Sequence, residues 1–262
     1  MRAIATSLAM LLFTVSLAQA EVKTKTIEYR VGDKTFDGYL AYDDSVEGPR
    51  PGIVVFHEWW GLNEYAKERT RMLAEQGYVA FAADMYGDGQ FVEHPKDAGA
   101  MAGKVRTNVD EWQKRAVVAL DILKAQPQCD PKKLAAIGYC FGGSTALQLG
   151  YTGADLDAIA TFHAALPTPT EEQAKAIKAE VLVCNGADDS FISQESIEAF
   201  QEKLKDANVS LNFVNFPGAV HSFTVEDAGK HNNPGMQYNK AADEKSWDLL
   251  MALLKKDLGE NK

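Results

Sequence analysis

The residues that most restrict the fold run from Leu134 to Ser144, an apolar segment that ends in Gly-Tyr-Cys-Phe-Gly-Gly-Ser. This order predicts a strand, a sharp turn and a helix. Gly138 and Gly142 flank Cys140 at the spacing of a nucleophile elbow, where strand and helix pass close to each other. A thiol at a helix N-terminus lies beside unpaired backbone N–H groups and the positive end of the helix dipole, which favour its thiolate form. The alternative, that Cys140 is one more buried small hydrophobic residue, does not account for the glycines.

The first twenty residues have the pattern of a secretory signal: Arg2, an apolar run from Ala3 to Leu17, and Ala18-Gln19-Ala20 before the cleavage point. We therefore expect residues 1–20 to be removed and the protein to be exported, either periplasmic or secreted. The formal net charge is −10 and no basic cluster is present. These features argue against nucleic acid or an anionic membrane as a partner. We expect a monomer that acts on a small molecule and makes no membrane contact after signal cleavage.

The chain has three cysteines, Cys129, Cys140 and Cys184. Three are too few for a disulfide scaffold, and an odd number in an oxidising compartment leaves at least one thiol free. Cys140 is the natural candidate for the free thiol. The sequence gives no basis for pairing the other two, and it leaves the redox state of Cys140 after export open.

Strands and helices alternate along the rest of the chain. Residues 23–30 and 34–41 alternate polar and apolar side chains around Val31-Gly32-Asp33, which predicts an antiparallel hairpin at a sheet edge. We expect further strands at 51–56, 78–83, 134–139, 156–162, 181–185 and 211–216, and helices at 64–76, 109–125, 143–150, 170–177, 194–207 and near 241–254. This alternation predicts an α/β fold with a mostly parallel sheet and helices on both faces.

Residues 86–108 interrupt this pattern. They are rich in Gly and Asp and have no clear hydrophobic period. We expect an excursion from the sheet that forms a lid or a pocket wall.

Polar residues follow three of the expected strands, at the sheet edge where ligands bind in such folds. Cys140, Asp189 and His221 occur in the chain order of the nucleophile, acid and histidine of α/β-hydrolases. In such a triad the histidine takes the thiol proton and later protonates the leaving group, while the aspartate orients the imidazole. Asp188 competes with Asp189, since a shift of one residue would exchange them. His163 faces the same edge, and we expect it to line the pocket.

Four motifs resemble the dienelactone hydrolase family of α/β-hydrolases, over essentially the whole mature length, 21–262, as one domain. They are Gly138-Tyr139-Cys140-Phe141-Gly142-Gly143, Gly186-Ala187-Asp188-Asp189-Ser190-Phe191, His221-Ser222-Phe223 and His57-Glu58-Trp59-Trp60-Gly61-Leu62-Asn63. The resemblance implies a Cys-Asp-His triad and favours Asp189, because the family's acid precedes a short polar-Phe-aliphatic run. It implies hydrolysis of a small ester or lactone without a cofactor.

The resemblance also implies a catalytic role for Glu58. In the family, a glutamate at this position contacts the resting thiol and shifts when substrate binds. Independently, a carboxylate beside two tryptophans at a strand end is partly desolvated, which raises its pKa. A plainer alternative is that Glu58 caps the following helix. His57-Glu58 also suggests a zinc motif, but Gly61 stands where H-E-x-x-H requires histidine, so we expect no metal.

We expect the oxyanion of the reaction to be bound by two backbone N–H groups, those of Phe141 and Trp59. The family's substrate-binding arginines have no evident counterpart, because Asp88 and Val225 stand nearest to those positions. The missing arginines favour an apolar or neutral substrate. Aromatic residues predict the pocket walls, although such residues are as often plain core; they are Trp59, Trp60, Tyr86, Phe191 and Phe223.

The sequence thus predicts a hydrolase of small esters or lactones that forms an acyl-thioester on Cys140. A different class remains open, a non-catalytic or weakly active small-molecule-binding protein on the same fold, which the missing arginines would explain. A redox or thiol-exchange role for Cys140 is a third possibility. The absence of a neighbouring C-x-x-C partner argues against it.

Overall fold

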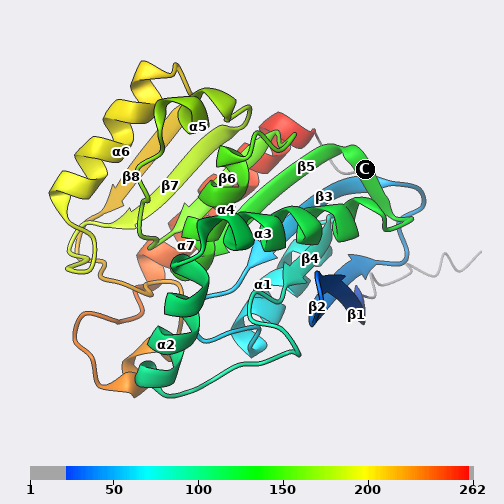
Figure 1. The fold of residues 1–262 in the computed structure, drawn as a ribbon, viewed down its shortest axis with the longest axis horizontal. Coiled ribbons are helices and arrows are strands. Elements are labelled where there is room, and N and C mark those ends of the chain that lie inside the picture. The colour runs from blue at the N-terminus through cyan, green and yellow to red at the C-terminus, as the bar shows by residue number, and fades with distance from the viewer. Residues whose placement is uncertain (1–21, 260–262) are drawn as a thin grey trace, which may run out of the picture.

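The computed structural model describes residues 22–259, so the predicted signal sequence lies outside the described residues. Within them, eight strands form one sheet in the order β1-β2-β4-β3-β5-β6-β7-β8 (Figure 1). The strands are β1 (Val22–Val31), β2 (Lys34–Asp43), β3 (Arg50–Phe56), β4 (Val79–Ala83), β5 (Cys129–Tyr139), β6 (Ala158–Phe162), β7 (Glu180–Gly186) and β8 (Leu211–Phe216). Strands β3 to β8 are mutually parallel, and β1 and β2 form an antiparallel hairpin at one edge. The predicted α/β-hydrolase fold and edge hairpin are confirmed.

Helices cover both faces of the sheet, as predicted. They are α1 (Glu64–Glu75), α2 (Pro95–Arg106), α3 (Val109–Lys124), α4 (Phe141–Tyr151), α5 (Glu171–Ala176), α6 (Gln194–Asp206) and α7 (Lys240–Leu258), with a short 3-10 helix η1 (Ala228–His231). Successive side chains of β3 point to opposite faces. Val54 and Phe56 join the core under α3, α4 and α6, whereas Ile53 and Val55 join the core under α1 and α7. Between residues 22 and 259, none of the helices is long and apolar enough to cross a membrane.

The segment 86–108 differs from its prediction because it contains a regular helix, α2. Proline at the first turn and the His94 side chain, which accepts a hydrogen bond from the Lys96 N–H, begin this helix. Its buried residues are Ala98, Ala102 and Val105. Ala102 and Val105 belong to the core that includes α3, whereas Ala98 packs with Trp60 and Met236. Small alanines give a weak hydrophobic period, and the helix was missed for that reason.

The carboxyl ends of the parallel strands meet at one edge of the sheet. Glu58 follows β3, Cys140 follows β5, Asp189 follows β7 and His221 follows β8. Parallel pairing in register along β3, β5, β6, β7 and β8 brings these four loops together. The sheet therefore places the candidate site residues next to one another although they are far apart in the sequence.

Candidate active site

Cys140 occupies a strained turn between β5 and α4. Its backbone has φ 53° and ψ −116°, in the left-handed half of the map that residues with side chains rarely adopt. A Cβ on Gly138 would lie 2.0 Å from the Gly142 carbonyl oxygen, and one on Gly142 would lie 2.1 Å from the Phe56 carbonyl oxygen. Only glycine fits at both positions. The turn holds the Cys140 side chain at the N-terminus of α4, where the helix dipole favours an anion.

A hydrogen-bonded chain joins Cys140, His221 and Asp189. His221 Nε2 lies 3.1 Å from Cys140 Sγ, and His221 Nδ1 lies 2.8 Å from Asp189 Oδ2. The other oxygen of Asp189 accepts a hydrogen bond of 2.9 Å from the Phe191 N–H. Asp188 is exposed and does not reach His221. The structure therefore brings Asp189, rather than Asp188, to the histidine.

The pKa of His221 reflects two opposing effects. Burial disfavours the imidazolium and by itself lowers the pKa. The charge of Cys140 and the hydrogen bonds to Asp189 and Cys140 act in the opposite direction and prevail, raising the pKa to about 10. His221 is thus arranged to hold a proton beside Cys140.

Glu58 lies beside this chain but does not contact the thiol. Its side chain is 2% exposed, and its Oε1 accepts a 3.1 Å hydrogen bond from Ser222 Oγ, next to His221. Burial raises the pKa of Glu58 to about 7, while the charge of His221 and the bond from Ser222 oppose the rise. The contact with the thiol that the family resemblance implied is therefore replaced, in this structure, by a contact with Ser222. Neither Glu58 oxygen caps α1, whose N-terminal side-chain cap is Asn63.

A cavity of 330 Å³ opens over Cys140 and His221. This thiol cavity is lined by Trp59, Pro95, Arg106, Cys140, Ala165, Phe191, Ile192, His221, His231, Asn233 and Met236. Of the predicted aromatic walls, Trp59 and Phe191 line it. The excursion 86–108 does supply a pocket wall, because Pro95 and Arg106 belong to α2.

Arg106 is the residue that the sequence analysis missed. Its guanidinium lies 5.3 Å from the centre of the Phe141 ring, and among residues 22–259 no carboxylate pairs with it. A cation therefore does line the thiol cavity, from a different element than the positions of Asp88 and Val225. A prediction of α2 would have pointed to Arg106, because this arginine is the last residue of the helix and directly follows the buried Val105.

The four other predicted pocket residues do not line the thiol cavity. Tyr86 is buried and donates a 2.8 Å hydrogen bond to the Trp59 carbonyl. Phe223 and His163 are fully buried beneath the site and contact each other. Trp60 belongs to a neighbouring cavity. A side chain at the active edge of the sheet can point either into the pocket or down into the core, and the direction is set by packing.

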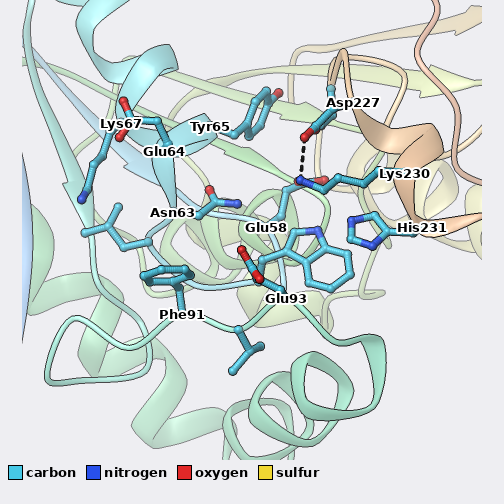
Figure 2. Close-up of a pocket in the computed structure, with 14 residues that line it drawn as sticks. Glu58, Asn63, Glu64, Tyr65, Lys67, Phe91, Glu93, Asp227, Lys230 and His231 are labelled. Atoms are coloured by element: carbon cyan, nitrogen blue, oxygen red, sulfur yellow. Dashed lines mark hydrogen bonds and ion pairs between the residues drawn. The ribbon is translucent and has the colours of Figure 1, made fainter.

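The neighbouring cavity, also 330 Å³, contains Glu58 on its wall (Figure 2). Its other lining residues include Trp60, Asn63, Tyr65, Phe91, Glu93, Asp227, Lys230 and His231. Lys230 pairs with Asp227 at 2.6 Å. The Trp60 and His231 rings stack at 4.3 Å, and His231 lines both cavities. Glu58 is thus reached from this second cavity, while Cys140 is reached from the thiol cavity.

The two predicted oxyanion donors lie on segments that touch. Phe141 is the first residue of α4, so its N–H has no partner within the helix. Trp59 follows β3 in the loop whose preceding carbonyls, those of Phe56 and His57, pack against Gly142. This close approach sets the Trp59 loop directly beside the elbow.

The described part of the chain groups no three His, Cys, Asp or Glu side chains as a metal ion would need. The His57 ring is engaged by the backbone, with Nε2 accepting a 3.1 Å hydrogen bond from the Met85 N–H. Cys129, Cys140 and Cys184 are all buried and form no disulfide. Cys140 is the one of these three that lines the thiol cavity.

Known proteins are similar to this chain in both sequence and fold. A putative carboxymethylenebutenolidase of Aquifex aeolicus is 28% identical over 205 residues, 76% of this chain and 87% of the relative. The solved structure of m3DLH has a TM-score of 0.88 and 39% identity, covering 90% of this chain and 99% of its own. The structure of a dienelactone hydrolase-like promiscuous phosphotriesterase from metagenomic libraries has a TM-score of 0.89 and 40% identity, covering 92% and 100%.

The sequence matches the dienelactone hydrolase family over residues 36–258, which is most of the chain. That range contains most of β2 and all of strands β3 to β8, and it includes the elbow at Cys140 and the histidine loop at His221. The similar solved structures share the fold over nearly their whole length. The chain therefore belongs to the dienelactone hydrolase family, and it is a hydrolase of the ester or lactone type.

Proposed function

We propose that this protein hydrolyses small esters or lactones through a triad of Cys140, His221 and Asp189. The observation that carries the proposal is the unbroken chain from Cys140 Sγ through His221 to Asp189, with contacts of 3.1 and 2.8 Å. A nucleophile that contacts a base, which in turn contacts an orienting acid, is the arrangement of covalent acyl transfer. The thiol cavity gives a substrate access to the nucleophile.

In the first half of the reaction, the Cys140 thiolate attacks the carbonyl carbon. The resulting oxyanion accepts hydrogen bonds from the N–H groups of Phe141 and Trp59. When the carbon–oxygen bond breaks, the leaving alkoxide takes the proton from His221 Nε2, and an acyl-thioester remains on Cys140. A lactone substrate keeps its alcohol attached to the acyl group.

In the second half, His221 acts as the general base. It removes a proton from water, and the hydroxide attacks the thioester carbonyl. Collapse of this second tetrahedral intermediate releases the acid and returns the thiolate beside the His221 cation. Asp189 accepts the Nδ1–H bond throughout, which keeps Nε2 directed at Sγ.

Glu58 supports this chemistry through its charge. Its carboxylate lies near His221, whose cation lowers the pKa of Glu58 against the effect of burial. By reciprocity, an ionised Glu58 stabilises the His221 cation. Glu58 also accepts a hydrogen bond from Ser222, which fixes the residue that directly follows His221.

The thiol cavity indicates the substrate class. A volume of 330 Å³ with walls of Trp59, Phe191, Ile192 and Met236 suits a small, largely apolar acyl group. Arg106 adds one cation to these walls. One relative by structure is named a promiscuous phosphotriesterase, so neutral phosphotriesters belong in the same substrate panel.

Intact-protein mass spectrometry during incubation with short-chain esters and lactones tests the proposal, with Cys140→Ala as the control. We expect a transient acyl mass on the wild type alone. Absence of both adduct and product across the panel, with the thiol intact, would favour the alternative of a non-catalytic binding protein. Ligand binding that Cys140→Ala leaves unchanged would support that alternative further.

A further inference from the structure

The loop after β8, which carries His221, is fixed by a buried polar cluster that the proposed reaction does not use. The cluster is centred on Thr224, three residues after His221 and 1% exposed. Its other members are Tyr65, Arg69, His163 and Asp243, which come from α1, from the end of β6 and from α7.

The Thr224 hydroxyl is shared by two side chains. Its Oγ1 lies 2.5 Å from the Tyr65 hydroxyl oxygen and 2.8 Å from His163 Nε2. The Thr224 carbonyl accepts a 2.6 Å bond from Arg69 Nη2, and Arg69 also pairs with Asp243 at 2.6 Å. Thr224 is therefore held through both its side chain and its backbone.

His163 connects this cluster to His221. The two imidazole rings lie 5.2 Å apart with an interplanar angle of 67°. On another side, the Phe191 ring lies 5.2 Å from His221 at 79°. Together with Asp189 on Nδ1 and Cys140 on Nε2, these contacts fix the plane and direction of the His221 ring.

Hydrogen-bond accounting assigns the proton of His163. Its Nδ1 is buried without a partner, and an orphaned lone pair is tolerated better than an orphaned N–H. The proton therefore lies on Nε2 and is donated to Thr224 Oγ1. Burial, followed by the charges of His221 and Arg69, lowers the pKa of His163 well below its usual value. His163 stays neutral and does not compete with the His221 cation.

Residues with a strained backbone surround His221 and the Thr224 cluster. Among residues 22–259, six residues other than glycine have positive φ, and Cys140, His163 and Ser222 are three of them. Such conformations persist only where surrounding contacts impose them. Ser222 lies between His221 and the Thr224 cluster, so the cluster and the Glu58 bond to Ser222 together hold the loop in this shape.

We propose that Thr224 is a positioning residue: its hydroxyl, shared with Tyr65 and His163, fixes the loop and the ring that keep His221 directed at Cys140. The inference rests on the proposed function, because it assigns a device for holding the base of the proposed triad. Thr224 touches neither Cys140 nor the thiol cavity. The groups with charge or a titratable proton that face His221 are Cys140, Asp189, Glu58 and His163.

The test uses Thr224→Val, which keeps the shape and removes the hydroxyl, and Thr224→Ser, which keeps the hydroxyl. The rate of iodoacetamide alkylation at Cys140 is measured from pH 5.5 to 9.5 by mass spectrometry of the peptide that carries it. No substrate is present. Wild type and Thr224→Ser should show the same dependence of rate on pH, because both keep the hydroxyl that holds His163 beside His221.

In Thr224→Val we expect the ratio of the rate at pH 6 to the rate at pH 9 to be about tenfold lower than in wild type, since a displaced imidazolium no longer stabilises the thiolate. A purely structural role would change thermal stability and leave this ratio as it is in wild type. A wild-type ratio in folded Thr224→Val overturns the proposal. Should that variant not fold, Tyr65→Phe removes one partner of the same hydroxyl and should lower the ratio about threefold; a wild-type ratio there has the same meaning.

A turnover assay separates this inference from the proposed function. With an ester that gives an acyl mass on wild type, Thr224→Val should lower kcat about tenfold and leave KM within about twofold, because the thiol cavity is unchanged. If no ester or lactone acylates wild type, the proposed function fails. The alkylation profiles still decide whether Thr224 positions His221.

Discussion

The Sγ of Cys140 lies 3.1 Å from Nε2 of His221, in a site where both side chains are buried. Burial acts against the charge of each group when it is alone. Together, the thiolate and the imidazolium compensate each other, and the pKa of His221 rises to about 10 against the effect of burial. The charge of Cys140 and the contact with Asp189 therefore keep His221 protonated up to a pH of about 10, which gives the pH dependence of the enzyme a definite sign.

Hydrolysis should decline at high pH while thiol reactivity persists. His221 keeps its proton below pH about 10, so the leaving group can be protonated there and loses its acid as the pH rises through that value. The thiolate itself remains above pH 10. We expect kcat/KM to fall above pH 10, with no fall in iodoacetamide alkylation. A loss of hydrolysis centred near neutral pH would contradict this assignment.

Protonated His221 beside Cys140 should also stabilise the fold, and this contribution to the unfolding free energy should be lost at high pH. A histidine whose folded pKa exceeds its unfolded value stabilises the fold fully below the unfolded pKa, near 6.5, and the contribution is lost as the pH rises through the folded pKa, about 10. Urea unfolding of wild type and His221→Gln at pH 6 and pH 10.5 measures it. The difference in unfolding free energy between the two proteins should be larger at pH 6.

Asp189 and Asp188 form a matched pair for testing the acid. Asp189→Asn removes the charge that fixes the His221 tautomer, and a comparable change in a serine protease triad costs about 10⁴ in kcat. We expect a fall of about 10³ to 10⁴ here. The Asp188 side chain is exposed, and it is the backbone N–H of this residue that donates a hydrogen bond to the Ala219 carbonyl. Asp188→Asn should stay within about twofold of wild type, and equal losses in both variants would refute the assignment.

The elbow and the order of the strands could be predicted because each rests on local chemistry. Glycine is required at positions 138 and 142 because a Cβ there would lie only 2.0 and 2.1 Å from a backbone carbonyl oxygen. The loops after β5, β7 and β8 meet because parallel strands point the same way. Sequence spacing is therefore sufficient to place Cys140, Asp189 and His221 at one edge.

The walls of the thiol cavity could not be predicted in the same way. Whether His163 or Phe223 points into the cavity depends on backbone turns and on packing between elements distant in the sequence. The Thr224 hydroxyl, for example, holds His163 beneath the site. Arg106 was missed because α2 buries alanines, whose small side chains give little periodic signal. Residue type and chain order were enough to choose Cys140, Asp189 and His221 as candidates, whereas the cavity walls depend on the direction in which each side chain points.

Glu58→Gln should stabilise the protein more at pH 8 than at pH 5. The pKa of Glu58 is raised from its usual 4.5 to about 7, so ionisation destabilises the fold. This cost is absent below pH 4.5, grows between 4.5 and 7, and is complete above 7. Glutamine can still accept the bond from Ser222. Urea unfolding should show a gain on the order of 2 to 3 kcal/mol at pH 8 relative to pH 5, and an equal effect at both pH values would contradict the raised pKa.

Arg106 should distinguish anionic from neutral substrates. Its guanidinium has no carboxylate partner in the described range and lines the thiol cavity. We expect Arg106→Leu to lower kcat/KM about fivefold for p-nitrophenyl hemisuccinate, whose carboxylate it would bind, with p-nitrophenyl butyrate nearly unchanged. Lys104→Leu is the control, because Lys104 lies on the same helical turn but lines a different cavity. Equal effects on both esters would mean that Arg106 acts through packing.

Two glycine substitutions test how tightly the elbow is built. In Gly142→Ala the new methyl group would lie 2.1 Å from the Phe56 carbonyl oxygen and 2.6 Å from that of His57. Both atoms are backbone and cannot move aside without shifting β3, so we expect a loss of about 3 kcal/mol or more in unfolding free energy. Gly103→Ala in α2 meets no atom within 4 Å, and it should gain about 0.5 to 1 kcal/mol from helix propensity. Urea unfolding of both variants measures these changes in unfolding free energy, and Cys140 alkylation serves as a second readout. If Gly142→Ala were as stable as wild type, the loop carrying Trp59 would not be pressed against the elbow, and its N–H would have no fixed place beside that of Phe141.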